Sequence, residues 1–298
     1  MKLLLLGKNG QVGFELQRSL APLGEVHAHC RRTCDLTDSA SVRNALETTR
    51  PDVIVHAAAY TAVDKAESER GLALRVNAES PRILAEYAAR RGALLVHYST
   101  DYVYDGSKAS PYVENDATGP LNVYGETKLA GEDAIRGAGC AHLIFRTSWV
   151  FGGHGNNFLK TILRLARERD RLTVVADQIG APTPASLIAD VTAHAIRRWY
   201  AAPERFAGGV YHLAPSGETS WHGYAQFVVA NARELGAQLA LSASAVVPIS
   251  TAEYPTAARR PANSRLETTK LRNYFGLTMP TWQSGVLHVL QLMTQGRP

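Results

Sequence analysis

Cysteine and long apolar runs are both scarce in this 298-residue chain. Its three cysteines, Cys30, Cys34 and Cys140, have neither the spacing of a metal site nor the even number of a disulfide framework. The opening apolar run stops at Gly7, too early for a signal peptide. No run reaches the roughly 18 apolar residues that a membrane span needs. We therefore expect a soluble, cytoplasmic protein with reduced thiols and no membrane partner.

A strong charge of one sign is also lacking. Lysine and arginine total 32 against 27 acidic residues, a net charge of +5. The basic residues are dispersed as short pairs, whereas a nucleic-acid-binding protein gathers them on one helix or tail. We expect small anionic ligands and no nucleic acid. With 45% hydrophobic and 20% charged residues, the composition is that of a globular protein and excludes a disordered one.

Apolar runs of strand length alternate with amphipathic helical stretches through the first half of the chain. Continuous apolar strands are typical of a parallel sheet buried on both faces, and their alternation with helices predicts an α/β doubly wound, Rossmann-like fold. We expect residues 1–150 to form a dinucleotide-binding domain. Residues 151–298 would mainly form a smaller substrate-binding lobe, with some segments returning to the first domain. The predicted strands are Leu3–Leu6, Val26–Cys30, Val53–Ala58, Leu94–Ser99 and His142–Phe145; the predicted helices are Val12–Leu20, Ser39–Thr48, Ala73–Arg91 and Thr127–Ile135.

A glycine-rich turn follows the first predicted strand, with the pattern G-x-x-G-x-x-G. Gly7 would permit a tight turn, Gly10 would let backbone approach a pyrophosphate, and Gly13 would let the next helix pack closely. The helix N-terminus, including Gln11 and Val12, would then offer N–H groups to phosphate. The turn predicts a dinucleotide site, and its two-residue spacing between the first glycines is that of extended short-chain dehydrogenases.

The residues after the second predicted strand bear on the choice of nicotinamide cofactor. NAD enzymes usually place a carboxylate there for the ribose 2′-hydroxyl, but this chain has Arg31 and Arg32. A guanidinium matches the geometry of a 2′-phosphate, although two solvated loop charges would look the same. We predict NADPH as the preferred cofactor, with NADH possible. Asp35 and Leu36 follow where an adenine ring would lie.

Tyr124 and Lys128 lie four residues apart at the start of a predicted helix, so they share one face. Reduction of a ketone creates an oxyanion that needs a proton, which a tyrosine can supply. A neighbouring ammonium should lower the tyrosine pKa from about 10. Thr100 ends a predicted strand and can hydrogen-bond the substrate carbonyl, with Ser99 as the alternative. These residues predict proton transfer beside the cofactor.

Small residues after the third predicted strand would let backbone lie against the cofactor. We expect cofactor contacts from Ala59, Tyr60 and Thr61, and from Tyr98 on the fourth strand. For His56, which ends the third predicted strand, a hydrogen bond to a neighbouring loop is a simpler interpretation than a catalytic role.

Taken together, these blocks resemble the dTDP-4-dehydrorhamnose reductases over nearly the whole chain. The resemblance implies that Tyr124 donates a proton, that Lys128 assists it and binds the nicotinamide ribose, and that Thr100 tunes the transfer. It also implies that Thr100, Asp101, Tyr124 and Trp149 contact a dTDP-sugar. The blocks that carry the resemblance are 7–13, 59–67, 98–103, 120–128, 146–150, 180–183 and 259–264.

One departure from the family concerns a metal. Some members dimerise through magnesium bound by glutamates; this chain keeps Glu15 but has Ser186 where a second acidic residue is expected. We therefore expect no metal site. The protein is expected to be a monomer or a homodimer.

The resemblance implies reduction at C4 of dTDP-4-dehydro-β-L-rhamnose, the last step of dTDP-L-rhamnose biosynthesis. Dehydratases of the superfamily carry Asp-Glu after the strand-end threonine, whereas here Tyr102 follows Asp101. A reductase of another nucleotide-linked 4-keto sugar, or a non-catalytic NADP-binding regulatory subunit, are the remaining alternatives.

Overall fold

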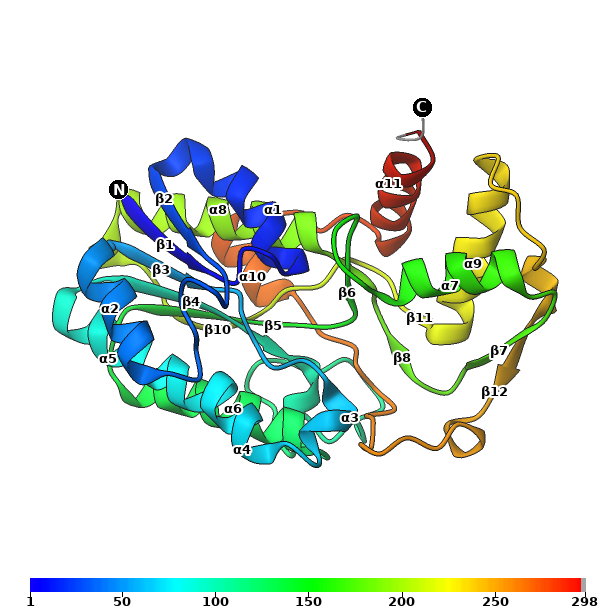
Figure 1. Cartoon of the computed structure of the whole chain (residues 1–298), viewed down its shortest axis with the longest axis horizontal. Coiled ribbons are helices and arrows are strands. Elements are labelled where there is room, and N and C mark those ends of the chain that lie inside the picture. Colours follow the sequence, from blue (N-terminus) through cyan, green and yellow to red (C-terminus); the bar gives the residue numbers. More distant parts are fainter. Residues whose placement is uncertain (296–298) are drawn as a thin grey trace.

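The computed structural model describes the backbone of residues 1–295 and the side chains of residues 1–293 (Figure 1). Its centre is a six-stranded parallel sheet with the strand order β10-β5-β4-β3-β1-β2. This is the predicted doubly wound fold. The strands are β1 (Lys2–Leu6), β2 (Glu25–His29), β3 (Val53–His56), β4 (Leu94–Thr100), β5 (His142–Thr147) and β10 (Gly209–His212).

Strand β1 shows why these apolar runs become central strands. Leu3 and Leu5 face one hydrophobic core of the sheet, and Leu4 and Leu6 face another. All four are at most 2% exposed. Since successive side chains of a strand point to opposite faces, a strand covered on both sides needs an uninterrupted apolar run.

Helices cover both faces of the sheet (Figure 1). The face that carries Leu3 and Leu5 packs against α1, α8 and α10, and the opposite face packs against α2, α5 and α6. The helix α4 lies against α6. Their bounds are α1 (Gln11–Leu20), α2 (Ser39–Thr49), α3 (Val63–Ala66), α4 (Arg70–Leu74), α5 (Ser80–Arg91), α6 (Val123–Gly137), α8 (Ala185–Ala201) and α10 (Thr269–Phe275).

A smaller lobe with a core of its own adjoins the carboxyl ends of the sheet strands. Among the described residues, no helix is both long and apolar enough to cross a membrane. The helices of the lobe are α7 (Phe158–Glu168), α9 (Trp221–Glu234) and α11 (Trp282–Gln295). Its strand pairs are β6 (Val150–Phe151) with β9 (Thr183–Pro184), β7 (Leu172–Val175) with β12 (Val246–Ile249), and β8 (Ile179–Gly180) with β11 (Thr219–Ser220).

The chain crosses between the two parts more than once. After leaving β5 it builds α7 in the lobe and returns through α8 to add β10 at the edge of the central sheet. It then builds α9 and comes back again for α10, whose Leu271 and Phe275 are buried in the sheet core. Residues beyond 150 therefore contribute to both cores.

Two predicted helices differ from the structure by more than one residue at an end. The stretch predicted as one helix over Ala73–Arg91 is α4, a π turn at Arg75–Glu79 and α5, with Pro81 in the first turn of α5. Because proline has no N–H to donate, the regular ladder is interrupted there. The helix predicted over Thr127–Ile135 begins four residues earlier, at Val123, because the Asn122 side chain caps it by accepting from Gly125 N at 2.8 Å.

Candidate active site

The glycine-rich turn lies between β1 and α1, where close backbone contacts exclude side chains. Gly7 has a φ of +94°, and a Cβ there would stand 2.7 Å from Ala58 N. A Cβ on Gly13 would stand 2.0 Å from the carbonyl oxygen of Gly7. Gly13 thus allows α1 to pack closely against the turn itself. Gly10 N donates to Gly7 O and Gly10 caps α1, which leaves first-turn N–H groups of the helix for an anion.

A cavity of about 210 Å³ adjoins this turn between the ends of β1, β2 and β3. Its walls are mostly small or apolar, as the adenosine half of a dinucleotide requires. Six of the residues predicted to bind the cofactor line it: Gly7, Arg31, Asp35, Leu36, Ala59 and Tyr60.

The charges at the mouth of this cavity suit a phosphate. Arg31 is 79% exposed, and its only charged partner among the described residues is Asp35, at 3.9 Å. The Asp35 carboxylate accepts from the backbone N–H and the hydroxyl of Thr37, and these bonds lower its pKa. Asp35 is therefore ionised and fixed, and Arg31, whose ion pair with it is long, keeps its other guanidinium N–H groups for an anionic ligand. Arg32 does not line the cavity.

The catalytic helix α6 meets the end of β4 through a glycine contact. A Cβ on Gly125 would stand only 2.2 Å from the carbonyl oxygen of Tyr102, so glycine alone permits this approach. The helix start is also tied to two other loops, because Val123 N donates to Glu67 and the Asn122 amide donates to Arg259 O. This packing places Tyr124 against the strand-end Thr100.

Tyr124 is held in its neutral form. Burial raises the pKa of its hydroxyl to about 12, a hydrogen bond with Thr100 opposes the shift, and the Asp101 carboxyl adds to it. Lys128 is not among the groups that act on Tyr124, so the lowered pKa that we expected is not found in this structure. A neutral tyrosine is the form that a reductase needs, because it holds the proton to be donated.

Asp101 is a buried carboxyl next to these groups, with an exposed fraction of 3%. Burial raises its pKa to about 7, although hydrogen bonds with Ser264 and Thr100 oppose the shift. Thr100 donates to one Asp101 oxygen at 3.1 Å, and the other oxygen has no partner among the described residues. One fully buried Asp101 oxygen thus lacks a hydrogen bond, and the sugar contact of Asp101 stays a prediction.

Lys128 is buried beneath Tyr124, and two acceptors hold its Nζ. It donates to the carbonyl oxygen of Tyr98 at 2.6 Å and lies 3.1 Å from His97 Nε2. Burial lowers its pKa to about 8, and the nearby Glu132 opposes that shift. Tyr98 therefore contributes its backbone, while its side chain packs in the sheet core and its hydroxyl bonds Thr192 at 2.8 Å.

Asn77 joins the loop after β3 to α6, a link that the sequence did not reveal. It lies fully buried in the π turn, where its amide accepts from Tyr60 N and donates to Tyr60 O and to Thr127 Oγ1, all within 3.1 Å. Nearby, a Cβ on Gly131 would stand 2.1 Å from Asn77 O. The interrupted helix around Pro81 was the one sequence signal of this arrangement.

A buried ion pair joins α6 to β5. Arg146 on β5 and Glu132 on α6 make two hydrogen bonds, at 2.6 and 2.9 Å, with exposed fractions of 2% and 0%. The arginine also donates to the Tyr104 hydroxyl. Such a pair fixes the register of helix and strand, because moving either one leaves a buried charge unpaired.

Trp149 stands at the junction of the two parts of the molecule with a φ of +47°, unusual for a residue with a side chain. Its ring stacks on Trp221 with centroids 3.7 Å apart. On its other side, a Cβ on Gly180 would stand 2.8 Å from the indole and 3.1 Å from the Cβ of Ser264. Because Ser264 also bonds Asp101, Trp149 is near the buried carboxyl.

The remaining predicted cofactor residues lie outside the cavity wall. Val12 packs against the sheet core, Thr61 is exposed, and Gln11 bonds the lobe through Val150 O and Asn157. Gln11 thereby ties the glycine-rich turn to the segment that follows β6.

The acidic residue that accompanies Glu15 is Asp190 rather than one at position 186. Both carboxylates pair with Arg18, at 3.5 and 2.9 Å. Within the described part of the chain, no group of three or more His, Cys, Asp and Glu side chains is arranged to hold a metal ion.

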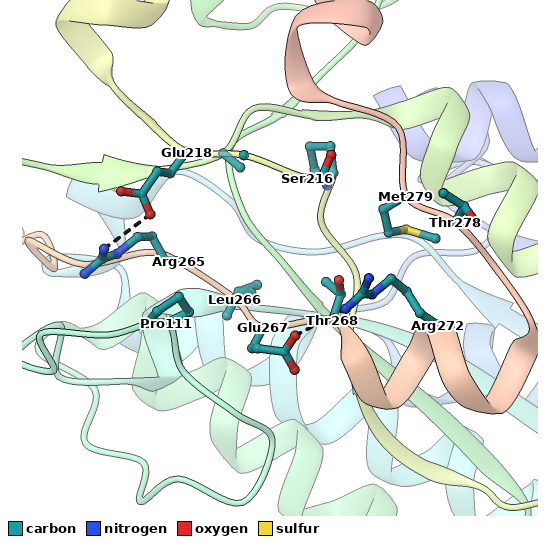
Figure 2. Close-up of a pocket in the computed structure, with 13 residues that line it drawn as sticks. Pro111, Ser216, Glu218, Arg265, Leu266, Glu267, Thr268, Arg272, Thr278 and Met279 are labelled. Atoms are coloured by element: carbon teal, nitrogen blue, oxygen red, sulfur yellow. Dashed lines mark hydrogen bonds and ion pairs between the residues drawn. The ribbon is translucent and has the colours of Figure 1, made fainter.

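A second cavity, of about 300 Å³, lies beyond the end of β10, and none of the predicted site residues lines it (Figure 2). The charged residues in its wall form ion pairs with one another. Arg265 pairs with Glu218 at 3.2 Å, and Arg272 lies 3.8 Å from Glu267. The reactive groups instead gather at the carboxyl ends of β3 and β4, where parallel sheets of this kind bind ligands.

Comparison with known proteins agrees with this geometry. The RmlD substrate binding domain family matches residues 1–295. The dTDP-4-dehydrorhamnose reductase of Shigella flexneri is 54% identical, over 97% of each chain. The crystal structure of the Clostridium acetobutylicum reductase is 33% identical with a TM-score of 0.89, covering 98% of this chain and 99% of that one.

A Bacillus anthracis dTDP-4-dehydrorhamnose reductase, solved in complex with NADP, is 36% identical with a TM-score of 0.86, and the match covers 97% of this chain and 99% of that one. The chain therefore belongs to the RmlD family, the dTDP-4-dehydrorhamnose reductases of the extended short-chain dehydrogenase/reductase superfamily.

Proposed function

We propose that this protein reduces the C4 keto group of dTDP-4-dehydro-β-L-rhamnose to give dTDP-β-L-rhamnose, the final step of dTDP-L-rhamnose biosynthesis. The observation that carries the proposal is the meeting of Thr100, Tyr124 and Lys128 at the carboxyl edge of the sheet, beside the cavity that begins at Gly7. A non-catalytic subunit has no need of a half-buried neutral tyrosine and a buried lysine at that place.

The residues fit a nicotinamide dinucleotide. The glycine contacts at Gly7 and Gly13 form a cradle that any Cβ would fill, and the adjoining cavity has small walls. When bound, NADPH supplies the hydride. Lys128, already held through two of its N–H groups, would offer the third to the nicotinamide ribose.

Tyr124 performs the proton transfer in this mechanism. Its neutral hydroxyl donates to the keto oxygen as negative charge develops there, and the Thr100 hydroxyl would turn its one O–H from Asp101 to the same oxygen. Lys128 does not act on the Tyr124 hydroxyl in this structure, and its proposed role is to bind the nicotinamide ribose. Asp101 and Trp149 would contact the sugar, as the family resemblance implies.

Arg31 favours NADPH over NADH because its exposed guanidinium lines the cavity and makes only a long ion pair with Asp35, so it can bind a 2′-phosphate. A related protein was solved with NADP, which supports this choice. We place the reaction in the cytoplasm, in keeping with the unpaired thiols of Cys30, Cys34 and Cys140.

The test is NADPH and NADH oxidation by the purified protein, with dTDP-4-dehydrorhamnose generated in situ by its upstream epimerase. We expect dTDP-rhamnose, faster turnover with NADPH, and a loss of about a thousandfold in kcat for Tyr124→Phe. Arg31→Ala should weaken NADPH binding about tenfold and spare NADH, and Arg32→Ala is the matched control. Cofactor binding without turnover would contradict the proposal.

A further inference from the structure

A row of buried nitrogen atoms leads from Lys128 into the sheet, and the reaction described above makes no use of it. Lys128 Nζ lies 3.1 Å from His97 Nε2, and His97 Nδ1 lies 3.0 Å from His56 Nδ1. The two histidines are register partners on β4 and β3, and their rings stack with centroids 5.1 Å apart. All three side chains are at most 2% exposed.

The chemistry of these groups sets the direction of each hydrogen bond. A lysine ammonium only donates, so His97 Nε2 must be an acceptor and the proton of that ring must lie on Nδ1. That N–H then donates to His56 Nδ1, which places the His56 proton on Nε2. Burial and the nearby Lys128 keep both rings neutral, with the pKa of His56 lowered to about 3 and that of His97 lowered well below its usual value.

This arrangement immobilises a side chain that is otherwise flexible. The two acceptors of Lys128 are the ring of His97 and the carbonyl of Tyr98, adjacent residues of one buried strand. Because both acceptors hold its Nζ atom, the four-carbon side chain of Lys128 loses most of its rotamer freedom before any ligand binds. The third N–H is thereby given a single direction.

We propose that His97, oriented by His56, is a positioning residue that aims the free N–H of Lys128 at the reaction centre. The inference rests on the proposed function, because the role of Lys128 does. The other charged group close to the lysine is Glu132, on the same helix, and its carboxylate is committed to Arg146 on β5. His97 is thus the side-chain acceptor that β4 contributes, and it adds no charge of its own.

The first test compares two substitutions at position 97. His97→Gln keeps an acceptor near the place of Nε2, and His97→Leu removes it. We expect His97→Leu to lower kcat about thirtyfold, the range for a lost hydrogen bond to a charged group, and to move the alkaline limb of the kcat–pH profile down by about one unit. His97→Gln should retain the limb and stay within about threefold of the parent kcat.

His56→Leu should fall between these two, because it leaves the His97 ring in place but removes the acceptor that sets its tautomer. Equal losses in His97→Gln and His97→Leu, with an unmoved alkaline limb, would overturn the proposal by assigning the ring to packing alone. Thermal unfolding and NADPH binding of each variant separate a folding defect from a catalytic one.

The second test needs no substitution and no substrate. Long-range ¹H–¹⁵N spectra of the parent protein report which ring nitrogen carries the proton. We expect an Nδ1–H ring at His97 and an Nε2–H ring at His56, both unchanged from pH 6 to pH 8. An Nε2–H ring at His97 would refute the inference even if turnover is confirmed, and the expected pair would support it even if the substrate is another keto sugar.

Discussion

The contact between Gly125 and the turn after β4 allows a prediction about catalysis without touching a reactive group. In Gly125→Ala, the new Cβ would stand 2.2 Å from Tyr102 O, whereas ordinary contact begins near 3.4 Å. The start of α6 must therefore retreat by about 1 Å. Because Tyr124 and Lys128 lie on this turn of the helix, both reactive groups move with it. A misplacement of about that size can cost roughly a hundredfold in rate.

The expected cost in stability is smaller than the cost in activity. Overpacking costs about 1–3 kcal/mol, and alanine regains up to about 1 kcal/mol over glycine in a helix. We expect the free energy of unfolding of Gly125→Ala to fall by about 1–2 kcal/mol while kcat for NADPH oxidation falls about a hundredfold. Chemical denaturation and steady-state kinetics on the same preparation measure the two effects.

Gly137 at the other end of α6 provides the matched control, because a Cβ there meets nothing within 4 Å. Gly137→Ala should keep the parent kcat and be as stable or slightly more so. Gly131→Ala is the second comparison: its Cβ would stand 2.1 Å from Asn77 O, so it should destabilise the fold to a similar degree with a smaller loss of kcat. A folded Gly125→Ala protein with parent kcat would refute the reasoning.

Three further predictions concern buried polar groups. Glu132→Gln should lower the free energy of unfolding by about 3–5 kcal/mol, since it leaves Arg146 buried and unpaired. Glu168→Gln is the control. It loses only an exposed ion pair and should change the free energy of unfolding by less than about 1 kcal/mol in the same denaturation assay. The Asp101 pKa of about 7 lies above its unfolded value of 3.8, so its contribution to stability is full below pH 4 and is lost as pH rises to 7. Denaturation across that range should show a fall of a few kcal/mol that Asp101→Asn lacks, and an unchanged slope in the variant would contradict the assignment. Asn77→Ala should cost about 3 kcal/mol and raise the Kd for NADPH, because it leaves both backbone groups of Tyr60 unpaired; calorimetry showing unaltered binding would argue against the link.

The sequence alone determined the features that depend on local pattern. Uninterrupted apolar runs such as Leu3–Leu6 required a sheet covered on both faces, and Gly7 and Gly13 make backbone contacts that no other residue permits. The four-residue separation of Tyr124 and Lys128 placed both on one face of a helix. These inferences needed neighbours along the chain and nothing more, and the fold and family agree with them.

Only the tertiary structure decided what surrounds each reactive group. The pKa of Tyr124 depends on burial and on Thr100 and Asp101, which are distant in sequence, so the lowered value expected from Lys128 alone was wrong. The acceptors of Lys128 come from β4, and Asn77 becomes a link only because a π turn presents it to both Tyr60 and α6. Desolvation and long-range hydrogen bonds arise when strands and helices pack, and a linear pattern of residue types does not encode which partners then meet.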